Sequence, residues 1–199
     1  MINCGYYYWN NEVRLLSQIN KIINKKSVLK KDVGKAKNST KTSIVKYIDY
    51  GHLNKFLNEY VVKALSVNSD YFGYSLFPMS PTKILNVNYY SENEKYEWHC
   101  DASRNPVNDI KLTLLINLSE KKYEGGEFQI FESENPETIF NFSKGGDMLL
   151  LKSSILHRVN PVTKGIRKSL TIFLEGPKFI WLYLITIGIL NQQYLQKSV

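Results

Sequence analysis

The sequence predicts an α+β fold in which N-terminal helices support an antiparallel β sandwich or barrel such as a jelly roll. Two patterns predict it. Apolar residues recur at helical spacing before residue 70, whereas short runs of β-branched, leucine and aromatic residues follow after residue 80. The length of 199 residues suits one domain, and a hydrophobic content of 43% is enough for a buried core. We therefore expect residues 1–199 to form a single domain.

The first part of the chain contains two amphipathic segments. Apolar residues at 3.6-residue spacing predict one helix over about residues 10–25 and a second helix from Gly51 to about Val67. Turn-forming residues between the two segments indicate a loop. We expect residues 1–80 to provide helical support and a basic loop.

Short strand-like runs, separated by Gly, Pro, Asn or Ser, follow in the second part. The Gly125–Gly126 pair is typical of a hairpin turn that needs positive φ. We expect residues 84–176 to form the β-rich core and residues 177–199 to form an apolar C-terminal extension. The predicted strands cover 83–90, 111–118, 126–131, 147–152 and 168–174.

The net charge of +8 is concentrated in one segment, residues 21–46, which contains nine lysines and a single acid, Asp32. A lysine run attracts phosphates or other anions without selecting among them. This run has no arginine and no aromatic residue, which argues against a nucleic-acid groove. We interpret it as a solvated surface loop, with guidance of an acidic protein or a nucleic acid towards the site as the alternative.

Cysteine usage favours a reduced, cytoplasmic setting. Cys4 and Cys100 have neither disulfide nor metal-finger spacing, and the N-terminus does not resemble a signal peptide. The longest apolar run, residues 179–190, has 12 residues, fewer than the roughly 17 that a membrane-spanning helix needs. We expect no transmembrane span. We expect this run to pack, as a strand or helix, on the N-terminal helices, to form a dimer contact or to attach to a membrane surface. The oligomeric state therefore stays open.

Codon preference gives a hint about the source. Lys, Asn, Ile and Tyr are abundant, and all four have AT-rich codons. Such a composition is typical of a low-GC genome, for example that of a phage, a virus or an AT-rich bacterium.

A candidate metal site is formed by His99, Asp101 and His157. In an extended chain, residues i and i+2 point to the same face, so His99 and Asp101 can share one ion, and Cys100 should turn to the opposite face as a small buried residue. His157 follows a predicted strand 58 positions later. Two imidazoles and one carboxylate form the facial triad that suits non-haem Fe(II) and leaves positions open for further ligands.

A candidate anion site follows ten residues after His157. Strand alternation places one set of residues of the segment 165–173 on the same face: Arg167, Ser169, Thr171 and Phe173. An arginine that points into a barrel needs an anion, and its planar fork of donors matches a carboxylate. A nearby hydroxyl can donate one more hydrogen bond to the same group.

Four motifs in this order and spacing carry a resemblance to a known family: HCD, YEGGEFQIF, GGDMLLLKSSILHRV and GIRKSLTIFLEGP. They resemble the Fe(II)/2-oxoglutarate-dependent oxygenases of the prolyl 4-hydroxylase-like, PKHD-type class. The resemblance covers about residues 84–176. It implies a double-stranded β-helix core, with His99, Asp101 and His157 as iron ligands, Arg167 as the 2-oxoglutarate anchor, and Ser169 and Tyr90 as further co-substrate contacts. Asn117 departs from the family, which often has an aromatic residue in that strand.

The resemblance also implies an activity: hydroxylation of an unactivated C–H bond with Fe(II), 2-oxoglutarate and O2, yielding succinate and CO2, with ascorbate as a candidate further cofactor. A peptidyl, prolyl-type side chain is the first choice of substrate. The alternatives are a nucleic-acid base, a small molecule, and a non-catalytic jelly-roll protein that retains a metal site.

Overall fold

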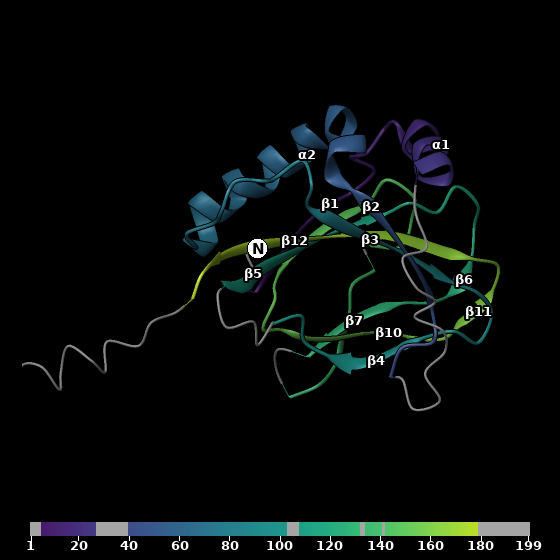
Figure 1. The fold of residues 1–199 in the computed structure, drawn as a ribbon. Coiled ribbons are helices and arrows are strands. Elements are labelled where there is room, and N and C mark those ends of the chain that lie inside the picture. Colours follow the sequence, from purple (N-terminus) through teal and green to yellow (C-terminus); the bar gives the residue numbers. More distant parts are fainter. Residues whose placement is uncertain (1–4, 27–39, 103–107, 132–133, 141, 179–199) are drawn as a thin grey trace, which may run out of the picture.

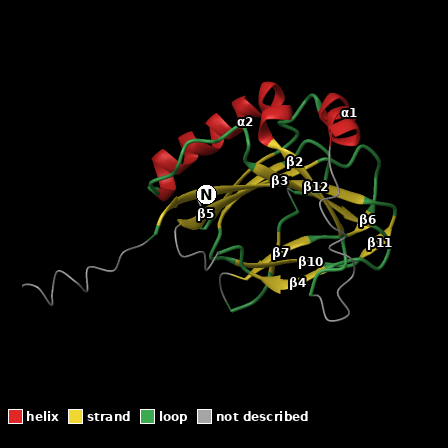
Figure 2. Ribbon diagram, viewed as in Figure 1, coloured by secondary structure: helices red, strands yellow, loops and turns green. Residues whose placement is uncertain are grey.

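The computed structural model describes residues 5–26, 40–102, 108–131, 134–140 and 142–178 (Figure 1). Its elements form three layers: two helices, a larger sheet beneath them, and a smaller sheet that faces the other side of the larger one (Figures 1 and 2). The space between the two sheets is where inward-pointing side chains of both can meet.

The larger sheet consists of six antiparallel strands. They are β1 (Tyr6–Trp9), β2 (Ile44–Asp49), β3 (Ile84–Tyr90), β5 (Asn108–Asn117), β9 (Met148–Lys152) and β12 (Arg167–Pro177). Their order across the sheet is β1-β9-β5-β12-β3-β2, so the long strands β5 and β12 are central neighbours. Central strands have both sides paired, which holds the residues along them in a fixed register.

The smaller sheet consists of four short antiparallel strands in the order β4-β10-β7-β8. They are β4 (Tyr96–His99), β7 (Phe128–Phe131), β8 (Glu137–Thr138) and β10 (Leu156–Val159). A two-stranded ladder of β6 (Glu124–Gly125) and β11 (Val162–Lys164) closes one end. Gly125 and Gly126 adopt φ of +71° and +65°, as predicted. They do not close the predicted hairpin, because they join β6 to β7 and these two strands pair with other strands.

The helices α1 (Leu16–Lys26) and α2 (Asn54–Val67) lie on the outer face of the larger sheet (Figure 1). A 3-10 turn, Tyr50–His52, precedes α2 and a π-helical turn, Asn68–Phe72, follows it. Each helix buries one apolar stripe, which includes Ile19 and Ile23 of α1 and Leu57 and Val61 of α2. Burial of such stripes stabilises helices of this length, which are marginal in isolation.

Alternation along the strands divides the apolar core into two clusters. Outward residues of the larger sheet, such as Leu114 and Ile172, join the helix stripes in the first cluster. Inward residues, such as Leu115 and Leu149, join Phe128 of the smaller sheet in the second cluster. A strand buried on both faces needs apolar residues at consecutive positions, which explains runs such as MLLL in β9.

Several sequence-based boundaries change in the structure. The first helix begins at residue 16 rather than 10, because the backbone N–H groups of Glu12 and Val13 donate to Gly146 O and tie this stretch to the β-rich half. The basic segment is not one loop. Three of its lysines lie in α1 and Lys46 lies in β2. Most of the remaining lysines, and the apolar run 179–190, lie outside the described residues. Among the described helices, none has the length and apolar character needed to cross a membrane.

Candidate metal centre

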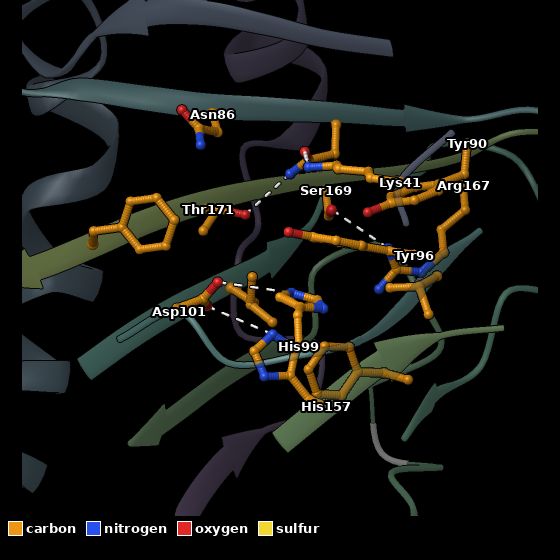
Figure 3. A pocket seen from close by; sticks show the side chains of 15 residues that line it. Lys41, Asn86, Tyr90, Tyr96, His99, Asp101, His157, Arg167, Ser169 and Thr171 are labelled. Atoms are coloured by element: carbon orange, nitrogen blue, oxygen red, sulfur yellow. Dashed lines mark hydrogen bonds and ion pairs between the residues drawn. The ribbon is translucent and has the colours of Figure 1, made fainter. Parts of the chain in front are cut away.

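Three side chains with metal-binding groups meet between the smaller sheet and β5. His99 is the last residue of β4, Asp101 follows it by two residues, and His157 lies in β10. Because His157 is the register partner of His99, their ring centroids lie 4.1 Å apart. One ligand atom from each of the three residues lies within 4.8 Å of the others. Figure 3 shows Asp101 facing both rings.

Backbone carbonyls orient the two imidazoles. The Nδ1 atom of His99 lies 2.8 Å from Glu97 O, and that of His157 lies 2.9 Å from Ile155 O. A carbonyl oxygen only accepts, so Nδ1–H donates in each ring and Nε2 keeps the lone pair that a metal requires. Burial, together with the neighbouring His157, lowers the pKa of His99 to about 4. His99 is therefore neutral near pH 7 and available as a ligand.

Asp101 supplies the third donor. Its Oδ1 lies 3.7 Å from His99 Nε2, and its Oδ2 lies 3.5 Å from His157 Nε2. The Thr113 hydroxyl, on the inward face of β5, donates to Oδ2 at 2.8 Å. The Asp101 N–H donates to Ser153 O at 2.9 Å and fixes the backbone. Two neutral nitrogens and one carboxylate, converging from one side, could hold a divalent ion such as Fe(II).

A buried guanidinium lies at the other end of the same space. Arg167, the first residue of β12, is 1% exposed, and the rings of Tyr90 and Phe142 lie 5.5 Å from its guanidinium carbon. Its Nη1 donates weakly to Ser169 Oγ at 3.4 Å, and its Nε has no partner among the described residues. No described carboxylate forms an ion pair with it. A buried charge without a counter-ion is costly, so the site fits an external anion.

Gly126 lies against the side chain that carries this guanidinium. A Cβ atom at this residue would lie 3.0 Å from Arg167 Cδ and 3.0 Å from Val162 Cγ2. The arginine therefore rests directly on glycine backbone, in a turn whose φ of +65° also favours glycine.

A cavity of about 100 Å³ connects the triad with the guanidinium. Arg167, Ser169 and Thr171 of β12 form one wall, and Phe128, His157 and Val159 of the smaller sheet form part of the other. The cavity thus joins a candidate metal site to a candidate anion site, as Figure 3 shows.

Comparison with known proteins identifies a family to which this arrangement of side chains corresponds. Residues 85–175, which contain the triad and Arg167, match the family model of the 2OG-Fe(II) oxygenase superfamily, where 2OG is 2-oxoglutarate. The matched part of the chain, residues 85–175, is a 2OG-Fe(II) oxygenase domain. The cofactor and co-substrate of a 2OG-Fe(II) oxygenase are Fe(II) and 2-oxoglutarate. The donor set of the triad and the orphaned guanidinium fit both.

Curated relatives of this 2OG-Fe(II) oxygenase are PKHD-type hydroxylases. The one from Pseudoalteromonas atlantica is 32% identical over 134 residues, covering 60% of this chain and 54% of the relative. The one from Idiomarina loihiensis is 40% identical over 103 residues, covering 49% of this chain and 45% of the relative. The chain therefore spans about half the length of the curated relatives it matches.

Solved structures of prolyl hydroxylases share the fold. A Pseudomonas putida prolyl-4-hydroxylase superposes with a TM-score of 0.67 at 16% identity, over 87% of this chain and 94% of that chain. A viral collagen prolyl hydroxylase from Paramecium bursaria chlorella virus-1, solved as a 2OG complex, gives 0.62 at 15% identity, over 86% and 96%. These likenesses show the jelly-roll fold of the 2OG-Fe(II) oxygenase.

Tyr90 and Ser169 line the same cavity as Arg167. Tyr90, at the end of β3, is the register partner of Arg167. Burial raises the pKa of Tyr90 to about 12, so its phenol is neutral and can donate. The structure thus brings together all six site residues of the sequence analysis.

One detail of the sequence analysis is wrong. Cys100 is exposed rather than buried, because β4 ends at His99 and strand alternation does not continue through residue 100.

Asn117, where the sequence departs from the family, is not among the residues that line the cavity. Its amide donates to the Tyr123 hydroxyl, and Leu115, two residues earlier on the same face of β5, lines the cavity instead.

Sequence reasoning also missed three residues at the site: Lys41, Tyr96 and Thr113. The Tyr96 ring stacks on His99 at 3.4 Å between centroids, which fixes the plane of that imidazole. Local spacing carried no signal, because strand alternation puts residues three apart on opposite faces, and a register shift between β4 and β10 accompanies the contact. Thr113 gave no signal, because its contact to Asp101 depends on strand packing. Lys41 was hidden inside the lysine run, although its side chain lines the cavity.

Proposed function

We propose that this 2OG-Fe(II) oxygenase is a dioxygenase that hydroxylates an unactivated C–H bond of a peptidyl, prolyl-type side chain. The observation that carries the proposal is a single cavity with a His-Asp-His triad at one end and an orphaned, buried guanidinium at the other. A dicarboxylic keto acid can bridge two such sites, with its keto acid end at the metal and its distal carboxylate at the arginine.

Each residue of the site has its own role in binding the metal or the co-substrate. His99, Asp101 and His157 hold the iron, and the Thr113 hydroxyl keeps the Asp101 carboxylate turned towards it. Arg167 binds the distal carboxylate of 2-oxoglutarate in a planar fork. Ser169 and the neutral phenol of Tyr90 lie on the same wall of the cavity, where each can donate one more hydrogen bond.

Bound Fe(II) and 2-oxoglutarate supply activation of O2, in which 2-oxoglutarate loses CO2 to become succinate and one oxygen atom is delivered to a C–H bond. The chain must hold the substrate carbon beside the metal and limit the entry of water. The apolar side chains of Phe128, Val159 and Leu115 line the cavity and serve this exclusion. Ascorbate is a candidate reductant for restoring iron that becomes oxidised without substrate.

The peptide substrate is supported by the neighbours in structure. Several are prolyl hydroxylases, and the one from Trichoplax adhaerens was solved in complex with a peptide fragment. Nucleic acid as substrate has no comparable support from the relatives and solved structures named above.

The test is succinate release from purified protein given Fe(II), 2-oxoglutarate and O2, with and without proline-containing peptides. We expect slow succinate release without peptide, faster release with a suitable peptide, and a peptide product heavier by one oxygen atom. Absence of succinate under all conditions would identify a non-catalytic metal-binding protein. Succinate without oxygen on any peptide, but with oxygen on an oligonucleotide, would move the substrate to nucleic acid.

A further inference from the structure

The cavity opens into a groove at one of its ends. Asn86 of β3 and Phe173 of β12 line both the cavity and this wider groove, which has a volume of about 500 Å³. The other described residues that line the groove are Ser80, Thr82, Lys83, Ile84 and Glu175. The groove therefore lies over the start of β3 and the end of β12, next to the cavity.

The strand register places this opening at the metal end of the cavity. Phe173 is six residues from Arg167 along β12, which corresponds to about 20 Å in an extended strand. Phe173 is also the register partner of Thr113, whose hydroxyl donates to Asp101. Figure 3 shows Asn86 and Asp101 towards one end of the cavity and Arg167 at the other.

The position of the groove separates it from the co-substrate. In the proposed function, 2-oxoglutarate spans the distance from the triad to Arg167, so it lies on the Arg167 side of the metal. The groove begins on the opposite side, at Phe173 and Asn86. A molecule that holds a C–H bond beside the metal can therefore extend into the groove without meeting the co-substrate.

Most polar side chains of the groove already have partners within it. Lys83 forms an ion pair with Glu175, and the hydroxyls of Ser80 and Thr82 share a hydrogen bond at 2.9 Å. Asn86 differs, because its side-chain amide has no hydrogen-bond partner among the described residues. The described part of the groove thus offers one free amide, with both a donor and an acceptor, and its charges compensate each other.

Apolar side chains provide the remaining contact area. Phe173 is half-buried where the groove meets the cavity, and Ile84, the first residue of β3, is 43% exposed. Exposed apolar area beside a catalytic cavity suits the side chain of a bound peptide, because contact removes that area from water.

We propose that this groove binds the peptide substrate next to its hydroxylated residue, and that Asn86 is a specificity-determining residue that binds the peptide backbone. This inference rests on the proposed function. The Asn86 amide can donate to a peptide C=O and accept from a peptide N–H, while Phe173 and Ile84 contact an apolar side chain. Since Lys83 and Glu175 compensate each other, the groove suits an uncharged segment.

The first test fills the groove. Ile84→Trp enlarges an exposed side chain that lines the groove and is not among the residues that line the cavity. The probes are acetylated and amidated heptapeptides with a central proline and uncharged flanking residues. We expect Ile84→Trp to raise the KM for these peptides about tenfold, and to raise it more than the KM for 2-oxoglutarate.

Ile44→Trp is the matched control. Ile44 of β2 is 50% exposed and is not among the residues that line the cavity or the groove. An equal rise of the peptide KM in both variants, or no rise in Ile84→Trp, would overturn the proposal. Failure of the unsubstituted protein to hydroxylate any of the peptides would instead contradict the proposed function.

The charge of the peptide is the second variable. Peptides with Glu or with Lys beside the proline should have a higher KM than the uncharged peptides, because either charge competes with the pair of Lys83 and Glu175. A lower KM for either charged set would overturn the assignment of an uncharged segment.

The third test isolates the contact between Asn86 and the peptide backbone. The backbone nitrogens beside the proline are methylated one at a time, and binding is measured calorimetrically on protein loaded with Mn(II) and 2-oxoglutarate. At one position, methylation should weaken binding to the unsubstituted protein about tenfold, the effect of one hydrogen bond, and binding to Asn86→Leu less than about twofold. An equal loss in both proteins at every position would show that Asn86 does not bind the backbone.

Discussion

The two sheets of the molecule differ in size and in what they carry. In the larger sheet, β5 and β12 have 10 and 11 residues and are paired on both sides, and their outward faces pack under the helices. In the smaller sheet, no strand exceeds four residues, yet it provides both histidines of the triad. Stability and metal chemistry are therefore assigned to different layers, and the anion site belongs to the larger one.

The way each layer fixes its functional groups also differs. Arg167 is held by the register of a long strand and by a buried environment. The histidines are held by their own backbone, through Nδ1 hydrogen bonds to carbonyls two residues earlier in the chain. Short strands can serve as a metal platform because these local bonds do not depend on the length of the sheet.

The largest expected effect comes from the smaller sheet. His157→Ala should abolish succinate release, because the triad loses a ligand and two donors do not hold Fe(II) firmly. Fe(II) binding and succinate release are measured for this variant and for the unsubstituted protein. His52→Ala is the matched control, since His52 is exposed in the turn before α2. Turnover by His157→Ala at the rate of the unsubstituted protein would remove this residue from the site.

The larger sheet should govern the co-substrate instead. Arg167→Ala should raise the KM for 2-oxoglutarate about 100-fold while iron still binds, because a buried charged hydrogen bond is worth about 2 to 3 kcal/mol. Arg158→Ala provides the control, because Arg158 lies over Trp98 and does not line the cavity. An unchanged KM in Arg167→Ala would contradict the anchor assignment.

Stability should follow the larger sheet. Leu114 is fully buried between β5 and the helices, whereas Phe131 at the end of β7 is 41% exposed. We expect Leu114→Ala to lower the free energy of unfolding by about 3 kcal/mol, from lost burial and a cavity, and Phe131→Ala to lower it by less than about 1 kcal/mol. Urea unfolding of the two variants measures the difference. Equal losses of unfolding free energy would mean that the two sheets contribute equally to stability.

A smaller effect is expected where the two sheets touch. Thr113 of β5 orients Asp101, so Thr113→Val should weaken Fe(II) binding about tenfold, whereas Thr113→Ser keeps the hydroxyl and most of the affinity. Titration with Fe(II) under anaerobic conditions tests both. If the valine variant binds iron as tightly as the serine variant, the hydrogen bond has no part in the site.

The last effect concerns pH and the metal-free protein, and it is absent at neutral pH. The pKa of His99 falls from 6.5 to about 4 on folding, so the unfolded chain takes up a proton that the folded one refuses. The contribution of His99 to stability is therefore complete above pH 6.5 and is lost as the pH falls towards 4. Unfolding at a series of pH values should show a shallower decline for His99→Gln. Equal slopes would show that this imidazole is not responsible.

Sequence patterns predicted the parts of the molecule that depend on periodicity. The core strands β3, β5, β9 and β12 follow the predicted runs within a few residues, and the inward face of β12 carries Arg167 and Ser169 as alternation requires. Spacing predicted the His99–Asp101 pair, and the facial-triad pattern and the family resemblance added His157; the structure brings the three together.

Features that depend on packing or on the ends of strands could not be obtained in this way. Cys100 was misplaced because β4 stops one residue before it. Lys41 looked like one more solvated lysine, because nothing in the local sequence shows that its backbone pairs with Tyr96, 55 residues further along. The residues around Thr113 in the sequence are typical of any strand. Its hydrogen bond to Asp101 forms only in the folded protein, where β5 faces Asp101.

The contact between Gly126 and Arg167 makes the anion end of the cavity sensitive to a residue that binds no ligand itself. A Cβ atom at residue 126 would lie 3.0 Å from Arg167 Cδ, so even alanine there would require the arginine side chain or the turn to shift. A substitution of this glycine should therefore disturb the anion site while the three metal-binding side chains stay in place.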